Sequence, residues 1–183
     1  MPTVFTHAFT AAAIGSGMQP NEGTLKFFAL GMGCAMLPDA DVIAFAFNIP
    51  YSHMLGHRGL THSLPFAIVF GLIVAALAYG SHFRKRIWWG YALYFILATA
   101  SHGLLDAFTN GGLGVAFFAP WMEKRYFAPE LWRKIQVSPI GASRFFSAYG
   151  WKVFKSEILW IWLPSTAWMG LMWWRNRRKA ART

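Results

Sequence analysis

Charged residues are scarce in this chain. Only 13% of its 183 residues are charged, against roughly 25% in an ordinary soluble domain. Apolar residues make up 56% of the chain and aromatic residues 18%, and ten of the aromatic residues are tryptophans, which anchor helices at membrane surfaces. This composition excludes an ordinary soluble protein and predicts an integral membrane protein with a single domain over residues 1–183.

Cysteine and acidic residues are also rare. The single Cys34 excludes an intrachain disulfide framework. Seven acidic residues face 17 basic ones, giving a formal net charge of +10. The basic residues cluster in short segments that flank apolar runs, as expected for anchoring in an anionic membrane. We therefore expect membrane lipid, including anionic phospholipid, as the partner, and no nucleic acid. The sequence does not indicate an oligomeric state.

Three apolar runs predict membrane helices. Leu64–Gly80 and Ile87–Phe108 are the clearest, and the basic turn Ser81–Arg86 joins them. The third run, Ile158–Trp174, is expected to bend near Pro164. No signal peptide is expected, because the first 18 residues lack a positively charged start and His7 interrupts their apolar character.

The N-terminal part predicts shorter elements. Thr3–Ser16 is Ala-rich and typical of a helix, and a polar turn is expected over Gln19–Gly23. Leu25–Leu37 is helical in character but too short to cross a membrane, and Pro38-Asp39-Ala40-Asp41 interrupts it before apolar sequence resumes over Val42–Ile49. Carboxylates there are costly in lipid, so we expect a broken or re-entrant element whose aspartates face a protein-lined or wet cavity.

The C-terminal part is different in kind. Leu113–Lys155 mixes aromatic and basic residues with prolines, which predicts short amphipathic pieces lying on the membrane, and Arg175–Thr183 is a basic tail. The expected fold is an all-α, polytopic membrane helical bundle with about three to four membrane helices plus broken or re-entrant and interfacial helices. The short basic segments Arg84–Arg86 and Arg175–Thr183 share one side and place it in the cytoplasm.

Two histidine motifs stand at the ends of apolar runs. His57-Arg58-Gly59-Leu60-Thr61-His62-Ser63 precedes the first clear helix, and Ser101-His102-Gly103-Leu104-Leu105-Asp106 ends the second. Because the two helices are expected to be antiparallel, both motifs should lie at the same end of the pair. His102 and Asp106, four residues apart on a helix, share a face about 5–6 Å apart at Cβ. They suit one metal ion, or equally a structural His–Asp hydrogen bond. Thr61 and Ser63 are expected to orient the histidines or to cap the following helix.

The aspartates strengthen the metal interpretation. Asp39, Asp41 and Asp106 are the only aspartates in the chain, and all three lie in or beside apolar segments. Imidazole and carboxylate ligands together suit Zn²⁺, or Mn²⁺ or Fe. His53 ranks below His57 and His62 as a ligand, His82 lies at the opposite end of its helix, and Asn110 is expected to cap a helix end. The spacing of His7 decides nothing.

These residues resemble a known family. Thr6-His7, Pro38-Asp39-Ala40-Asp41, the H-R-G-x-T-H-S string over 57–63 and His102-x-x-x-Asp106 resemble the bacterial membrane-bound metal-dependent hydrolases, one branch of which is known as LexA-regulated inner-membrane proteins. The likeness covers a family core over residues 1–127. Composition predicts the remainder as an interfacial segment at 128–157, a membrane helix at 158–174 and a basic tail at 175–183. It implies a location in the bacterial inner membrane and control by the SOS response.

That family is in turn distantly similar to zinc-dependent phospholipases C and single-strand nucleases. This likeness implies metal ligands at His7, at Asp39 or Asp41, at His57 or His62, and at His102 and Asp106. Those enzymes have a further His…His-x-x-x-Glu set, whereas no histidine follows His102 here. One or two zinc ions are therefore expected rather than a trinuclear cluster.

The leading functional hypothesis is metal-assisted hydrolysis of a phosphoester, with phospholipid as a candidate substrate. The carboxylate among Asp39 and Asp41 that does not bind metal would accept a proton from water. Arg58 would pair with a substrate phosphate, or alternatively anchor the chain to a lipid headgroup. The alternatives are a non-enzymatic membrane protein with a structural metal, acting in membrane remodelling or stress response, and a small ion transporter. The positive-inside rule places the site on the outer, periplasmic face.

Overall fold

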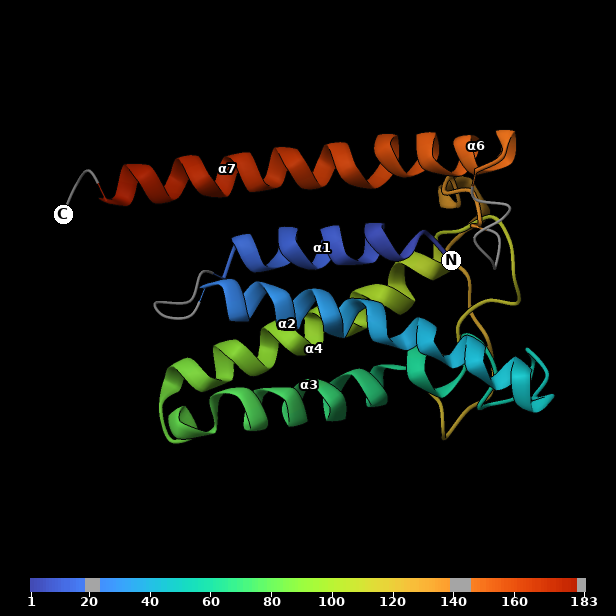
Figure 1. Cartoon of the computed structure of the whole chain (residues 1–183), viewed down its shortest axis with the longest axis horizontal. Coiled ribbons are helices and arrows are strands. Elements are labelled where there is room, and N and C mark those ends of the chain that lie inside the picture. Colours follow the sequence, from blue (N-terminus) through green and yellow to red (C-terminus); the bar gives the residue numbers. More distant parts are fainter. Residues whose placement is uncertain (19–23, 139–145, 181–183) are drawn as a thin grey trace.

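The chain folds into a bundle of helices in the computed structural model, which describes residues 1–18, 24–138 and 146–180 (Figure 1). Over these residues the fold is all-α, as predicted, with two isolated β-bridges and no β-strand. The long helices are α1 (Val4–Ser16), α2 (Thr24–Met36), α3 (Leu64–Tyr79), α4 (Arg86–Ala107), α6 (Ala148–Glu157) and α7 (Leu163–Ala180).

α3 and α4 form the predicted antiparallel hairpin. Their bounds agree to within a residue with the predicted helices Leu64–Gly80 and Ile87–Phe108. Ser63 caps α3, since its hydroxyl accepts the backbone N–H of Phe66 at 3.2 Å. The 3₁₀ turn η3 (Gly80–His82) and the basic residues after it connect the two helices at one end of the bundle. The start of α3 and the end of α4 therefore meet at the other end (Figure 1).

The interruption predicted at Pro38 is a change of helix type. α2 passes directly into the 3₁₀ helix η1 (Leu37–Phe47), and Asn48 ends it in the left-handed conformation with φ 57°. Pro38 is the second residue of η1, at the point where α-helical bonding changes to 3₁₀ bonding. The Ala35 carbonyl in the last turn of α2 accepts from Nδ1 of His102 instead. The two apolar pieces thus join into one helical stretch of 24 residues, Thr24–Phe47, in place of two separate segments.

Two helical stretches among the described residues, Thr24–Phe47 and Leu64–His82, are long and apolar enough to cross a membrane. The other two predicted spans, Ile87–Phe108 and Ile158–Trp174, form helices but are not among these two. α4 carries much of the buried core: Tyr94 and Phe95 are fully buried, and the Tyr94 hydroxyl donates to the Ala11 carbonyl at 3.1 Å. This contact fixes α4 against α1.

The chain after α4 departs from the predicted amphipathic pieces. It folds back as a loop, in which Val115 and Tyr126 form an antiparallel bridge, before the short 3₁₀ helix η4 (Glu130–Trp132). Arg125 organises this loop because its guanidinium donates to the carbonyls of Tyr51, His53 and His57. Helical structure resumes in α6. The predicted turn Gln19–Gly23, part of the interfacial segment (139–145) and the end of the basic tail (181–183) lie outside the described residues.

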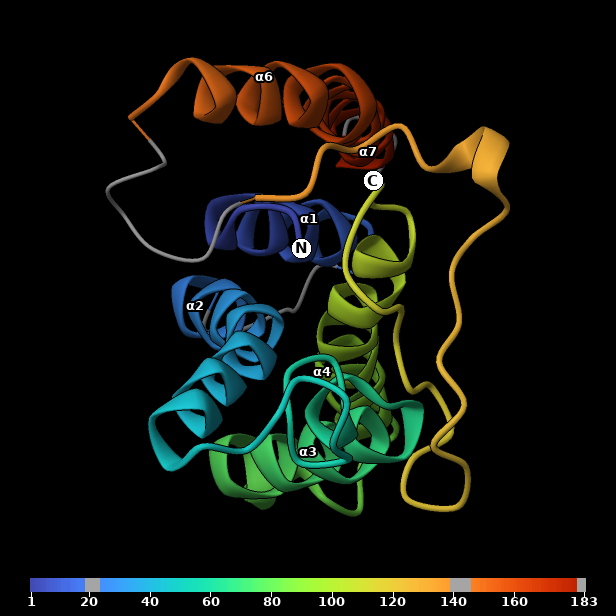
Figure 2. The same cartoon turned by 90° about the vertical axis from the view of Figure 1, so that its right-hand side faces the viewer.

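A single helical rod closes the bundle. α6, the π-helical turn η5 (Ile158–Trp162) and α7 run continuously along α1 (Figure 1). Pro164 falls at the second residue of α7, just after the π-helical turn. Figure 2 looks onto the end of the bundle where α1 begins, η1 ends, α3 begins and α4 ends. The predicted metal ligands lie at this end.

Candidate metal centre

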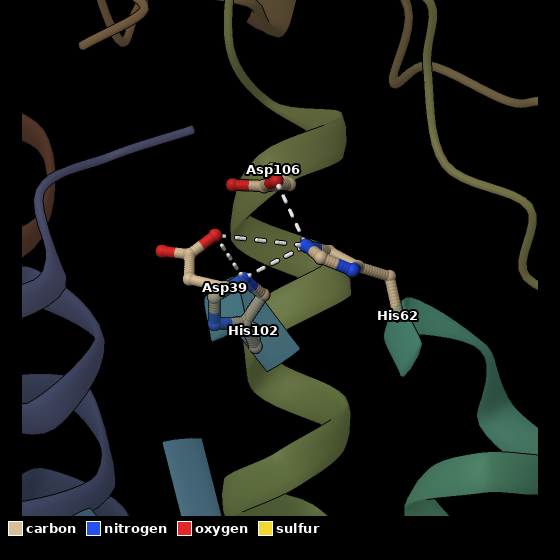
Figure 3. Close-up of side chains that lie close together, drawn as sticks. All are labelled: Asp39, His62, His102 and Asp106. Atoms are coloured by element: carbon tan, nitrogen blue, oxygen red, sulfur yellow. Dashed lines mark hydrogen bonds and ion pairs between the residues drawn. The ribbon is translucent and has the colours of Figure 1, made fainter. Parts of the chain in front are cut away.

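Four buried side chains from three elements converge at this end. Asp39 comes from η1, His62 from the 3₁₀ turn η2 (Leu60–His62), and His102 and Asp106 from one face of α4 (Figure 3). One ligand atom from each residue lies within 4.8 Å of all the others. The two imidazole Nε2 atoms are 3.0 Å apart, and Asp39 Oδ1 is 3.2 Å from Nε2 of His102. Asp106 Oδ2 lies 3.5 Å from Nε2 of His62.

A glycine permits this convergence. A Cβ at Gly103 would lie 2.5 Å from the carbonyl oxygen of His62, closer than carbon and oxygen can approach. The residue after His102 must therefore lack a side chain for η2 to reach α4. The His57–Ser63 loop has a similar constraint, since a Cβ at Gly59 would lie 2.0 Å from the carbonyl oxygen of Met54.

Hydrogen bonds outside the cluster orient its imidazoles. Nδ1 of His102 lies 2.6 Å from the Ala35 carbonyl, which can only accept, so Nδ1 carries the proton and the Nε2 lone pair points into the cluster. Nδ1 of His62 lies 3.1 Å from Asp41 Oδ2, which fixes the ring in the same sense. Both rings thus present Nε2 to a common centre, as metal-binding histidines do.

Asp41 belongs to a second group with His57 and His62. Its Oδ1 lies 2.7 Å from Nδ1 of His57, and its Oδ2 accepts the Arg58 backbone N–H at 3.2 Å and the Thr61 hydroxyl at 2.8 Å. Protein donors therefore surround this carboxylate. Arg58 adopts φ 62°, a strained backbone for a residue with a side chain, and the Asp41 bond helps to hold it there.

Asp39 and Asp106 differ from Asp41 in their hydrogen bonding. All four of their carboxylate oxygens are buried and accept no hydrogen bond of good geometry. Their partners are ion-pair contacts, from Arg58 Nε to Asp106 and from the Nε2 atoms of His62 and His102 to Asp39 and Asp106. Two carboxylates buried this close together repel each other and are costly unless cations hold them. Burial lowers the pKa of His62, but the facing carboxylates of Asp39 and Asp41 outweigh it and raise that pKa to about 9. The two nitrogens and two oxygens match the ligand set and number that Zn²⁺ prefers, so the residues present fit a divalent cation.

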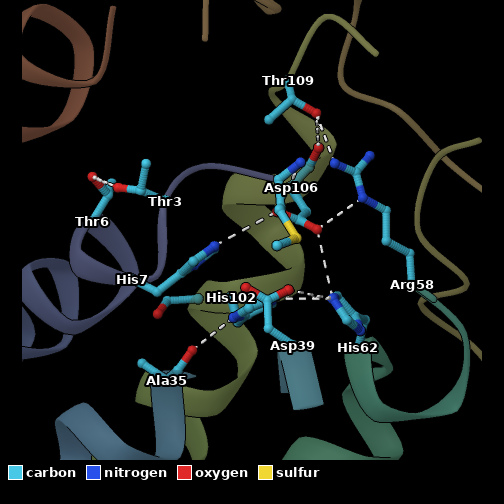
Figure 4. Close-up of polar contacts among 12 residues, drawn as sticks. Thr3, Thr6, His7, Ala35, Asp39, Arg58, His62, His102, Asp106 and Thr109 are labelled. Atoms are coloured by element: carbon cyan, nitrogen blue, oxygen red, sulfur yellow. Dashed lines mark hydrogen bonds and ion pairs between the residues drawn. The ribbon is translucent and has the colours of Figure 1, made fainter. Parts of the chain in front are cut away.

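Arg58 and His7 flank Asp106 (Figure 4). Nε of Arg58 lies 2.8 Å from Asp106 Oδ2, and the guanidinium also donates to the Thr109 hydroxyl and the Gly111 carbonyl. Arg58 is fully buried, so in this structure it contacts Asp106 and the protein interior rather than a lipid headgroup. Nε2 of His7 lies 3.7 Å from Asp106 Oδ1, and its ring stacks on His102 with ring centroids 3.7 Å apart.

Comparison with known proteins gives the family. The profile of the YdjM inner membrane protein family matches residues 1–179. The chain belongs to this family. It is also similar to the inner membrane protein YbcI of Escherichia coli (strain K12), with 42% identity over 180 residues, which cover 97% of this chain and 100% of that protein. No solved structure matches. The predicted bacterial inner-membrane family and location are therefore confirmed.

Three residues that the sequence ranked below the ligands or excluded as ligands lie apart from the cluster. Nδ1 of His53 accepts the backbone N–H of Leu55 at 3.1 Å. His82 contacts Ser81 at the far end of α3, as expected from the sequence. Asn110 does not cap α4: its side chain joins Gln136 and Val137, while the Thr109 hydroxyl donates to the Asp106 carbonyl.

Two groups that orient site residues were not predicted from the sequence. Thr109 holds the guanidinium of Arg58, and the Ala35 carbonyl orients His102 over a separation of 67 residues. A backbone carbonyl leaves no trace in an amino-acid sequence, because every residue has one. Thr109 stands three residues after Asp106 at a helix end, where a hydroxyl commonly bonds the preceding turn. That position was the only signal for it.

Proposed function

We propose that this chain is a membrane-bound, metal-dependent hydrolase of phosphoester bonds that acts on phospholipid. Asp39, His62, His102 and Asp106 would hold one Zn²⁺. The observation that carries this proposal is the convergence of two buried carboxylates and two imidazole Nε2 atoms, with one ligand atom of each residue within 4.8 Å of the others. A bound Zn²⁺ supplies an acidified water and polarises a phosphoryl oxygen.

The neighbouring group would provide the proton acceptor. Asp41 is surrounded by protein donors and contacts Nδ1 of His57 at 2.7 Å. This contact favours the His57 tautomer with the proton on Nδ1. Its Nε2 could then accept a proton from water, with Asp41 stabilising the resulting charge. Asp41 thus acts through His57, and Arg58 acts by fixing Asp106. A second ion beside Asp41 is disfavoured because four protein groups already contact this carboxylate.

A structural metal is the second candidate, and one observation favours it. All four ligands come from the protein, and Asp39, the most exposed of them, is only 9% exposed. Structural zinc sites are closed in this way, whereas catalytic sites keep one position for water. A structural ion would tie η1, η2 and α4 together at the membrane surface.

The deciding experiment compares variants of the purified full chain in lipid nanodiscs. Metal content is measured by elemental mass spectrometry, and hydrolysis by release of the phosphorylated headgroup from radiolabelled phosphatidylglycerol. His102→Ala should lose both metal and hydrolysis. His57→Gln, which removes the proposed proton acceptor and spares the four ligands and Asp41, should keep the metal and lose at least 100-fold in rate, the lower range of a general-base contribution. Glu130→Gln, an exposed carboxylate in η4, should change neither.

Other outcomes would exclude the hydrolase. Metal in the wild type without hydrolysis of phosphatidylglycerol, together with unfolding after chelation, supports the structural ion. Ion flux into liposomes that His102→Ala abolishes, with no headgroup release, supports the transporter.

We also propose that the metal-centre end faces the periplasm and that the SOS response controls expression. The basic turn before α4 and the basic end of α7 both lie at the opposite end of the bundle (Figure 1). Short basic segments favour the cytoplasmic side.

A further inference from the structure

A groove lies outside the metal centre, between the end of α4 and the π-helical turn η5. Its volume is about 510 Å³, within the range of small-molecule sites. Its apolar lining includes Leu105, Phe108, Leu131, Trp132, Trp160 and Ile161. None of the four cluster residues lines it. The groove therefore needs an explanation of its own.

One cation stands in this apolar lining. Among the described residues that line the groove, Lys134 is the only charged one, and its side chain is exposed. The backbone N–H of Lys134 donates to the Trp132 carbonyl at 2.8 Å, which fixes its position after η4. The described lining thus combines an apolar floor with one positive charge and no carboxylate, which complements an amphipathic anion.

The place of the groove in the membrane agrees with that ligand. Trp132 and Trp160 are 62% and 51% exposed, and tryptophans favour the level of the lipid headgroups. The lining comes from both sides of a gap: Leu105 and Phe108 from α4, and Trp160 and Ile161 from η5. π-helical turns are rare and often mark functional sites. A ligand here would connect the C-terminal rod with α4.

We propose that this groove binds one molecule of an anionic phospholipid. An acyl chain packs against Leu105, Phe108 and Ile161, and the phosphate pairs with Lys134. Zwitterionic lipid offers the same acyl chain but less net attraction to a single cation. The site is independent of the proposed hydrolysis, because it uses no metal ligand and leaves the bound lipid intact.

The test is native mass spectrometry of the full chain in detergent, titrated with phosphatidylglycerol or phosphatidylcholine of identical acyl chains. The wild type should bind the first lipid at least fivefold more tightly. Lys134→Gln should remove that preference, since one lysine near a membrane surface contributes about a fivefold change in affinity. Lys134→Arg should keep it. Lys152→Gln, an exposed basic residue of α6 outside the groove, should bind like the wild type.

Two further arms test where the lipid lies. Leu131 is 73% exposed, so Leu131→Glu should fold normally and should weaken phosphatidylglycerol by placing a negative charge in the groove. Glycerol phosphate, which has no acyl chain, should not compete. Equal binding of the two lipids to the wild type would overturn the proposal. So would an equal loss in Lys134→Gln and Lys152→Gln, or full competition by glycerol phosphate.

Discussion

Replacing Arg58 with methionine should weaken the metal-free fold and yet tighten metal binding. Arg58 is fully buried, and its guanidinium has three protein partners: the Asp106 carboxylate at 2.8 Å, the Gly111 carbonyl at 2.9 Å and the Thr109 hydroxyl at 3.2 Å. Methionine fills similar space without charge. The variant therefore leaves Asp106 buried beside Asp39 without its nearest cation, while the N-terminal ammonium, 4.0 Å from Asp106 Oδ1, and the cluster imidazoles still face it.

The magnitude depends on the metal. Without metal, removing one partner of a buried ion pair costs about 3–5 kcal/mol. With Zn²⁺ bound, the ion neutralises Asp106, and the remaining loss is that of the bonds to Gly111 and Thr109, about 1–3 kcal/mol. The difference is about 2 kcal/mol. Because coupling between two perturbations is reciprocal, zinc should bind about 30-fold more tightly to Arg58→Met than to the wild type.

Two measurements check this prediction. Urea unfolding in mixed micelles, with EDTA or with excess zinc, gives the cost of the substitution in each state. Competition with a zinc chelator of known affinity gives the change in metal binding. Arg58→Lys, which keeps the charge but loses the planar fork, should bind zinc close to the wild type. Equal destabilisation in both states, or weaker zinc binding by a folded Arg58→Met, would refute the assignment of Asp106 as a ligand that Arg58 neutralises.

Three further predictions follow from single contacts. Gly103→Ala should lower zinc affinity at least tenfold, because the added Cβ would lie 2.5 Å from the carbonyl oxygen of His62. Gly90→Ala lies on the same helix with open space around it and should not change the affinity. Glu157→Gln should lower the free energy of unfolding by about 1–3 kcal/mol in a thermal or urea melt. The buried Glu157 carboxylate accepts from the Thr3 backbone N–H and from the Thr3 and Thr6 hydroxyls, and an amide would turn an NH₂ group toward one of these donors. A melt like that of the wild type would contradict this. In a cysteine-free background, Met122→Cys should react with a membrane-impermeant thiol reagent from the periplasm and Ser81→Cys should not, and the reverse pattern would invert the proposed orientation.

Hydrophobic runs and turn chemistry were enough to predict much of the fold. The α3–α4 hairpin follows from two apolar runs around a basic turn, and its bounds are correct to within a residue. That topology alone brings His62 and His102 to one end. The loop from 109 to 129 was not predictable in the same way, because it is held by long-range bonds from Arg125 to carbonyls some 70 residues earlier.

The choice between Asp39 and Asp41 was also beyond the sequence. A 3₁₀ helix has about three residues per turn, so positions i and i+2 point roughly 120° apart. η1 has this form, and Asp39 therefore faces His102 while Asp41 faces His57. The segment Pro38-Asp39-Ala40-Asp41 in another conformation would orient these two carboxylates differently. The helix type depends on how η1 packs at the end of the bundle, which no local pattern records.

The burial of Arg58 was not predictable from the sequence for a related reason. Arginine is rarely fully buried without a partner. The sequence near Arg58 shows no such partner, so an exposed guanidinium in contact with phosphate was expected. The partner, Asp106, lies 48 positions later, and the pair forms only once α4 has docked.

Catalysis requires that one of the four ligands can make room for water. His102 is held by the Ala35 carbonyl, His62 by Asp41 and Asp106 by Arg58. The contacts given for Asp39 come from His62 and His102, which are themselves in the cluster, and Asp39 is the most exposed of the four. It is therefore the ligand that can move away from the metal at the lowest cost. Asp39→Asn should then keep most of the bound zinc in a catalytic site. In a closed structural site the same change should release the metal as readily as His102→Ala does, so the ratio of zinc retained by these two variants separates the two functions.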